Sequence, residues 1–257
     1  EYNRITQQIN EAKTASDWTD IYNKITNWDL ELTNSRNPLL DLLKMQRQEA
    51  NNAFTKFIKH NYESWIQDTE KAPIQSPRVF KEKIFPLLDR NEKVFVLLVD
   101  NLRLDQWREI KTLFASDFNI QEDSYFSILP TTTQYARNAM FAGLMPSQIA
   151  KLHPDRWVDE EDEDGKNLHE EVFLQAQIER LRKSYTFSYN KLMTSASGEK
   201  LAQNISNLSN NQLNVVVLNF IDMLSHARTD SKMIRELASD EAAYRLLTRS
   251  WIKHSST

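Results

Sequence analysis

Two short apolar runs constrain the fold more than any other feature of this 257-residue sequence. The first, Val94–Val99, is rich in valine and ends abruptly on Asp100. The second covers residues 214–220 and is followed by Asp222. Short apolar runs between polar residues are typical of strands that are buried on both faces. Because helical patterns separate the two runs, the sequence predicts an α/β fold with a mostly parallel sheet and flanking helices.

The first 68 residues have the periodicity of helices instead. Apolar side chains recur at helical spacing in three stretches, and Ser16 or Asp17 can cap the second of them. Pro38 suits the first turn of the third, where its missing N–H would have no helical partner. Residues 1–68 are therefore predicted to be a helical bundle, with the aromatic stripe as its core.

The rest of the chain is predicted to be a connector and an α/β domain. Residues 69–92 contain three of the seven prolines and form the predicted connector, whereas residues 93–257 form the domain. Further short strands are expected within residues 118–128 and 185–189. Helical spacing predicts helices over residues 104–116, 133–144, 168–183, 197–208 and 231–251.

Composition narrows the class of protein. Hydrophobic residues make up 40% of the chain and charged residues 26%, as in soluble globular proteins. No apolar run approaches the ~20 residues needed to cross a bilayer. The absence of cysteine excludes disulfides and thiolate zinc sites, and a net charge of -4 gives no basic field for duplex DNA. We therefore expect a cytoplasmic protein without membrane insertion.

Six consecutive acids at residues 159–164 are followed by Gly165. Like charges in such a block repel one another, so a solvated loop is the favoured interpretation. A cation-binding cluster is the alternative, although the spacing differs from that of an EF-hand loop.

Several side chains near the predicted strand ends could carry chemistry. If the two strands are parallel neighbours, Asp100 and Asp222 emerge at the same sheet edge, where a cation would relieve their repulsion. His226 follows Asp222 by four residues, so on a helical turn both side chains can face one ion, and such oxygen and nitrogen ligands suit zinc or manganese. Thr133 is expected at a helix N-terminus, which favours phosphate, and metal coordination can activate its hydroxyl.

Each of these residues also has a purely structural explanation. An Asp at a strand end often caps the next helix, and any of Thr131, Thr132 and Thr133 can do the same. A lone histidine such as His226 more often lies on a surface than on a metal. Spacing alone therefore leaves catalysis open.

Three motifs resemble those of PglZ domains, which belong to the alkaline phosphatase superfamily. Residues 99–105, Val-Asp-Asn-Leu-Arg-Leu-Asp, resemble the opening motif. Residues 130–133, Pro-Thr-Thr-Thr, resemble the nucleophile turn Pro-Thr-x-Thr, and residues 222–226 are similar to the metal motif Asp-x-x-x-His. The order of these motifs and the preceding helical bundle resemble PorX-type response regulators of type IX secretion systems.

The resemblance implies an alkaline-phosphatase-like fold and a site for two zinc ions. Asp100 and the oxygen of Thr133 would bind one ion, and Asp222 and His226 would bind the other. Thr133 would be the nucleophile because it occupies the fourth position of the motif, with Thr132 as the alternative. In-line displacement between two cations fits two-metal phosphoryl chemistry.

Two arginines are further candidates within the same resemblance. Arg103 and Arg137 would steady the phosphate or a carboxylate ligand, although Arg103 could equally pair with Asp105. Many superfamily members bind the oxyanion with an Asn three residues after the nucleophile. Here that position is Ala136 and the nearest Asn is Asn138, so this role stays unassigned.

The function implied for the intact protein is that of a response-regulator output region with zinc-dependent phosphodiesterase activity. Cyclic or short oligonucleotides would be the substrates, the protein would be a homodimer, and it would regulate type IX secretion. The superfamily completes its site with an Asp-His pair and a further His, and none is expected after Trp251. We therefore expect the bundle plus the first half of the PglZ domain, with weak or absent catalysis.

Two alternatives to a phosphodiesterase stay open. The first is a non-catalytic signalling module that binds a sigma factor or a secretion-motor subunit. The second is a related superfamily activity, such as that of a phosphomonoesterase or mutase.

Overall fold

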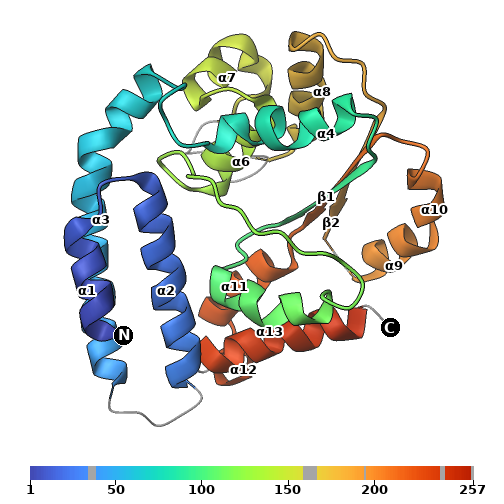
Figure 1. Ribbon diagram of the computed structural model, residues 1–257. Coiled ribbons are helices and arrows are strands. Elements are labelled where there is room, and N and C mark those ends of the chain that lie inside the picture. The colour runs from blue at the N-terminus through green and yellow to red at the C-terminus, as the bar shows by residue number, and fades with distance from the viewer. Residues whose placement is uncertain (34–38, 159–166, 194, 238–240, 256–257) are drawn as a thin grey trace. The chain divides into compact units, whose positions relative to one another are not determined.

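The computed structural model describes residues 1–33, 39–158, 167–193, 195–237 and 241–255 (Figure 1). The acidic run at residues 159–164 lies outside these residues. The chain divides into two compact units, each described by itself below. Unit 1 consists of Glu1–Pro73, Leu102–Ser124 and Ala227–Thr257, and unit 2 consists of Ile74–Asn101 and Tyr125–His226.

The secondary-structure elements of unit 1 are all helices within its described residues. Its elements are α1 (Tyr2–Glu11), α2 (Ala15–Thr33), α3 (Leu40–Gln67), α5 (Leu104–Ile110), the short η3 (Lys111–Leu113), α12 (Lys232–Leu237) and α13 (Glu241–Ser255). The helix predicted over residues 231–251 is therefore two helices in the described residues, α12 and α13.

Helices α1, α2 and α3 bury the apolar stripes that define the predicted bundle. The buried set is Ile5, Ile9, Trp18, Ile21, Ile25, Trp28, Leu32, Leu43 and Ala50. Trp18 packs against Phe54 and Phe57 with ring centroids 5.3 and 5.9 Å apart, so these aromatic residues are core, as predicted. Tyr22 differs from the prediction, because it is 57% exposed.

A capping box begins α2, one turn earlier than expected. The Thr14 hydroxyl accepts a hydrogen bond from the Asp17 N–H at 3.2 Å. The Asp17 carboxylate accepts in return from the N–H groups of Thr14 and Lys13 at 2.8 and 2.9 Å. The prediction that Ser16 or Asp17 is the cap is therefore wrong: Thr14 precedes the helix, and Asp17 completes the box from the third helical position.

Buried ion pairs join α2 and α3 to α5 and α13 within unit 1. The guanidinium of Arg245 lies 3.1 Å from Asp105 and 3.6 Å from Asp29. Arg47 pairs with the same Asp29 at 3.0 Å, and Arg103 grips Asp105 through two nitrogens at 2.9 and 2.7 Å. The two carboxylates thus each have two arginine partners.

Unit 2 contains the sheet and the helices that cover it. Its helical elements are η1 (Ser76–Arg78), the π-helical η2 (Phe80–Ile84), α4 (Phe85–Asp89), α6 (Thr133–Ala142), α7 (Pro146–Leu152), η4 (Pro154–Arg156), α8 (Glu170–Arg180), α9 (Ser195–Gln203) and α10 (Ile205–Leu208), with α11 (Phe220–Asp230) continuing into unit 1. Its strands are β1 (Val94–Val99), β2 (Phe187–Leu192) and β3 (Leu213–Leu218).

The three strands form a parallel sheet in the order β1-β3-β2. Val94 and Phe187 both align with Leu213, and this register continues along each pair. The central β3 is buried over most of its length, as its apolar run predicts. The predicted parallel α/β sheet is therefore confirmed, and β3 sets the position of both neighbours.

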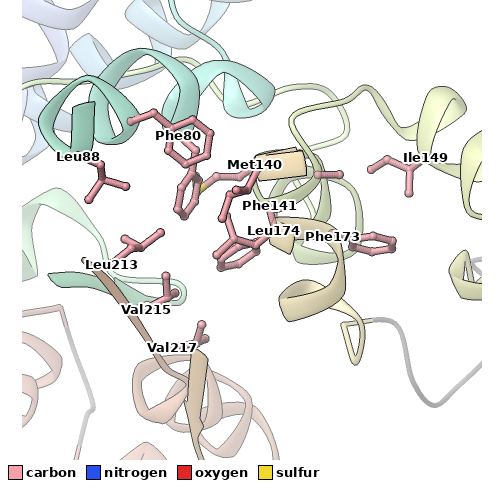
Figure 2. Packing of buried hydrophobic residues seen from close by; sticks show 13 residues of the cluster. Phe80, Leu88, Met140, Phe141, Ile149, Phe173, Leu174, Leu213, Val215 and Val217 are labelled. Atoms are coloured by element: carbon pink, nitrogen blue, oxygen red, sulfur yellow. The ribbon is translucent and has the colours of Figure 1, made fainter. Parts of the chain in front are cut away.

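One face of this sheet carries the core of unit 2. Figure 2 shows Phe80, Leu88 and Phe141 gathered near Leu213 and Val215 on β3. Alternate residues of a strand point to one face, so β3 contributes every second side chain to this cluster. The predicted connector also contributes to the core through η2 and α4, because Phe80, Phe85 and Leu88 are almost fully buried.

The opposite face of β1 departs from the prediction. Phe95 is 43% exposed and Leu97 is 61% exposed, so the prediction that residues 94–99 are buried on both faces is wrong. In the described sheet the exposure is confined to the edge strand, because Val216, the partner of Leu97 on the central β3, is 4% exposed. Sequence alone does not reveal which strand is central.

The remaining predicted elements mostly differ at their ends. Residues 118–128 contain a single bridge, between Phe126 and Gln75, in place of the expected strand. The strand expected at residues 185–189 is β2, which begins and ends slightly later. Helix α6 ends at Gly143 as predicted, in the left-handed conformation with φ 61°.

Candidate metal and phosphate site

The carboxyl ends of β1 and β3 lie side by side in unit 2. Val99 aligns with Leu218, and the Asp100 N–H donates to the Leu218 carbonyl at 3.0 Å. Asp222 lies in the first turn of α11, directly after β3. Burial raises the pKa of Asp100, Arg137 lowers it in part, and the charge of Asp222 raises it further. The structure therefore brings the two aspartates that follow the strands into electrostatic contact.

Helix α6 places a hydroxyl and a guanidinium on one face. Thr133 is its first residue and Arg137 follows by four positions, one turn later. The Arg137 side chain is only 6% exposed. One terminal nitrogen, Nη1, lies 2.7 Å from Asp100 and 3.4 Å from the side-chain oxygen of Asn219. Of the roles expected for Arg137, the structure thus shows contact with a carboxylate.

The other side of Arg137 is held by Glu170, which the sequence analysis did not single out. Nε of Arg137 donates to Oε1 of Glu170, whose side chain is completely buried. The hydroxyl of Tyr189 donates to Oε2, and Nζ of Lys191 lies 3.7 Å from the same oxygen. Both carboxylate oxygens of Glu170 are therefore engaged.

A sequence signal for Glu170 exists in the helical pattern of α8. Residues 170, 173, 174, 177 and 178 share one buried face, and Glu170 is the charged member of that stripe. A charge at a core position is seldom left without partners. Its partners could not be read from sequence, because Tyr189 and Lys191 lie on β2, at alternate positions of a strand whose sequence is largely polar.

The pKa values of these groups follow from their burial. Burial raises the pKa of the Tyr189 hydroxyl, and the neighbouring Glu170 carboxylate raises it further. Burial lowers the pKa of Lys191, an effect that Glu170 partly offsets. Tyr189 is therefore a neutral donor to Glu170 at physiological pH.

The N-terminus of α6 is the candidate anion-binding end of this arrangement. Within the described residues, the N-cap Thr132 makes no side-chain capping hydrogen bond, and the first turn of α6 has no acidic residue. Thr133 is half-buried at that end. The first N–H groups of a helix have no intrahelical partners, so a phosphate oxygen can accept from them. In α6 the Tyr135 N–H is already bonded to the Thr132 carbonyl at 3.0 Å, which leaves Thr133 and Gln134 as the candidate donors.

Asp222 and His226 form the second part of the site. They lie four residues apart on α11, with Nε2 of His226 3.6 Å from Oδ1 of Asp222. The two donors therefore face a common space, as zinc ligands must, and their oxygen and nitrogen chemistry fits zinc. Across the described residues, no three His, Asp or Glu side chains converge on one point. The residues present fit zinc in kind and supply part of a coordination shell.

The remaining predicted residues are placed as follows. Arg103 belongs to unit 1, where it pairs with Asp105 and lies 5.2 Å from the ring of Tyr244. The ion pair with Asp105 was one of the two roles expected for it. Asn138 is buried on α6, and Ala136 is half-buried.

The parallel sheet, the carboxylates beyond β1 and β3 and the hydroxyl that begins α6 define an alkaline-phosphatase-like α/β domain. Comparison with protein families agrees: residues 79–254 match the family described as BREX system PglZ alkaline phosphatase-like domain, and residues 1–66 match the PorX response regulator linker domain. The chain belongs to the PglZ family, and the two matches together identify it as a PorX-like regulator output region. Comparison with individually curated proteins gives no match. None of the described helices is both long and apolar enough to cross a membrane.

Proposed function

We propose that the intact protein is a zinc-dependent phosphodiesterase that acts on cyclic or short oligonucleotides and regulates type IX secretion. The observation that carries the proposal is that one face of α6 bears both Thr133 and Arg137, with Arg137 in contact with Asp100. The match to an alkaline phosphatase-like domain supports the reaction class.

The residues that would hold zinc are Asp100 with the Thr133 oxygen, and Asp222 with His226. Bound zinc would supply charge neutralisation and favour the deprotonated form of a coordinated hydroxyl or water. The site offers oxygen and nitrogen donors, which suit this ion, and Asp100 and Asp222 interact across it.

The protein groups would position the substrate and provide the nucleophile. The Thr133 hydroxyl would release its proton to solvent and its oxygen would attack phosphorus, while the bond to the leaving nucleoside oxygen breaks and that oxygen takes up a proton from solvent. The N–H groups at the start of α6, at Thr133 and Gln134, would donate to a phosphate oxygen. Water then cleaves the phosphothreonine ester and restores the hydroxyl.

Substitution of Thr133 by Val tests this proposal in the intact protein. We expect zinc-dependent hydrolysis of bis(p-nitrophenyl) phosphate to fall by roughly 10³-fold or more, because the nucleophile is removed without a change in volume. Thr55→Val, the same change at an exposed position of α3, is the matched control and should retain activity within about twofold. Thr132→Val distinguishes the two candidate nucleophiles.

The outcomes separate the possible activities. Unchanged hydrolysis in Thr133→Val, with loss in Thr132→Val, would move the nucleophile by one position. Activity that survives both changes would refute the threonine mechanism. Faster hydrolysis of p-nitrophenyl phosphate than of the diester would indicate a phosphomonoesterase.

A second candidate function is a non-catalytic module that binds a sigma factor or a secretion-motor subunit. The observation that favours it is that, in the described part of the chain, metal-binding side chains do not converge in groups of three. This candidate predicts that the double variant Asp100→Asn with Asp222→Asn still binds its partner, whereas the phosphodiesterase should lose zinc and activity. Partner capture and zinc content of the same protein sample distinguish the two.

A further inference from the structure

Arg137 occupies the place of a cation beside Asp100. Its Nη1 atom lies 2.7 Å from Oδ2 of Asp100, and its side chain is almost completely shielded from water. A zinc ion that binds Asp100 must share this carboxylate with the guanidinium or displace it. The two cations also repel each other at such short range, with little solvent to screen them.

Glu170 binds the same guanidinium as Asp100. The completely buried Glu170 accepts from Nε of Arg137, while Tyr189 and Lys191 hold its other oxygen. Because both oxygens are engaged, Glu170 cannot turn away without losing at least one partner. Arg137 is thus divided between two carboxylates, one fixed and the other facing the site.

The buried charges balance without any metal. Asp100 and Glu170 contribute two negative charges, and Arg137 and Lys191 contribute two positive charges, all within one connected network. Such a network is internally satisfied, so the site can fold in the absence of an ion. Asp222 adds a third negative charge near Asp100, outside this network, and favours a cation there. A divalent ion at Asp100 nevertheless lies against Arg137, and the repulsion between the two cations works against its binding.

We propose that Arg137 is a built-in counter-cation that competes with zinc for Asp100, and that Glu170 is the residue that positions Arg137 and limits this competition. The inference rests on the proposed function, because it takes Asp100 as a zinc ligand. Zinc affinity at Asp100 is then set by two residues that do not bind the metal themselves.

The test is zinc titration of the purified chain against a chromophoric chelator, with the variants compared at one pH. Removal of both members of the buried pair, Arg137→Gln with Glu170→Gln, leaves the net charge unchanged and should tighten zinc binding at least tenfold. Glu170→Gln alone keeps the shape but removes the charge, and its single amide oxygen can accept from only one of Arg137 and Tyr189, so Arg137 is left to pair with Asp100. It should weaken zinc binding by at least threefold.

A matched control separates positioning from simple charge. Glu171→Gln makes the same change in net charge on the adjacent, exposed residue and should leave zinc affinity within about twofold. Far-UV circular dichroism establishes that each variant is folded. If the double variant does not fold, the comparison of Glu170→Gln, which should weaken zinc binding, with Glu171→Gln, which should not, still decides the question.

The failures of the two ideas have different signatures. If Asp100→Asn leaves zinc binding unchanged, Asp100 is not a zinc ligand and the proposed metal site is wrong. If Asp100→Asn weakens zinc binding while the double variant binds no tighter than the parent chain, only the competition by Arg137 is refuted. Equal effects of Glu170→Gln and Glu171→Gln would likewise refute the positioning role of Glu170.

Discussion

Replacement of Arg245 by Met tests the buried ion pairs that join α13 to α2 and α5 in unit 1. Arg245 is 3% exposed, and its Nη1 atom contacts Asp105 at 3.1 Å and Asp29 at 3.6 Å. Methionine keeps much of the aliphatic packing but removes the charge. The two carboxylates would then depend on their second partners, Arg103 and Arg47.

The expected cost follows from these distances. At an effective dielectric constant of about 20, each contact corresponds to about 5 kcal/mol of Coulomb attraction. The desolvation of Arg245 offsets several kcal/mol of that sum, and the second arginines still neutralise Asp105 and Asp29. We therefore expect a loss of about 3 kcal/mol in the free energy of unfolding, at the lower end of the range for a broken buried pair.

Urea unfolding followed by tryptophan fluorescence measures this loss. Arg47→Met is the matched control, because Arg47 pairs with the same Asp29 but has a side chain that is 44% exposed. Exposed pairs contribute about 1 kcal/mol or less. Equal losses in the two variants, or a loss below about 1 kcal/mol in Arg245→Met, would refute the argument from burial.

The same ion pairs make the free energy of unfolding depend on pH in acid. Burial alone would raise the pKa of Asp105, but Arg103 and Arg245 outweigh it, so the pKa lies below its usual value of 3.8. A folded-state pKa below the unfolded one means that the ionised carboxylate stabilises the fold above about pH 4, and that this contribution is lost as the pH falls through the folded pKa. Arg245→Met should therefore show a smaller loss of stability in this acidic window than the parent chain.

Two further predictions concern local backbone features. Asp17→Ala should lower the free energy of unfolding by about 1 kcal/mol, because the capping box of α2 loses its acceptor. Hydrogen bonds from Lys13 and Thr14 lower the pKa of Asp17, so urea titrations should show this difference above about pH 4 and not in stronger acid. A difference that persists in acid would contradict the capping role. Gly143→Ala should cost at least about 2 kcal/mol in thermal or urea unfolding, because alanine is strained at φ 61° and its Cβ would clash with Gln177. Gly198→Ala is the control, because its Cβ would only make van der Waals contact with Leu192 at 4.0 Å, and it should be neutral or stabilising.

The sequence predicted the elements whose causes are local. The helical stripes of α1, α2 and α3 and the apolar run of β3 are visible within a single window, and the structure contains all four. The exposure of Leu97 was not predictable, because it depends on whether β1 has one neighbouring strand or two. The boundaries of β2 were missed for a related reason: its side chains are polar, and its partner lies further along the chain.

The site residues likewise differ in whether local sequence reveals them. Asp100, Asp222 and Thr133 were found because each follows a strand or begins a helix, which a short motif reveals. Glu170 and Tyr189 were missed because their importance comes from Arg137, which reaches Glu170 from another helix. Networks assembled from distant segments leave little trace in any one of them.

The pairing of β1 with β3 has a consequence for synthesis on the ribosome. Val94 pairs with Leu213, so the partner of each β1 residue is synthesised 119 residues later. At 5–20 residues per second, a nascent chain carries β1 for roughly 6–24 s before β3 has been made. The α1–α3 bundle is complete within the first 67 residues and can form early. During that interval the apolar side chains of β1 are available to chaperones that bind extended hydrophobic segments, which makes this strand the point at which co-translational assistance would act.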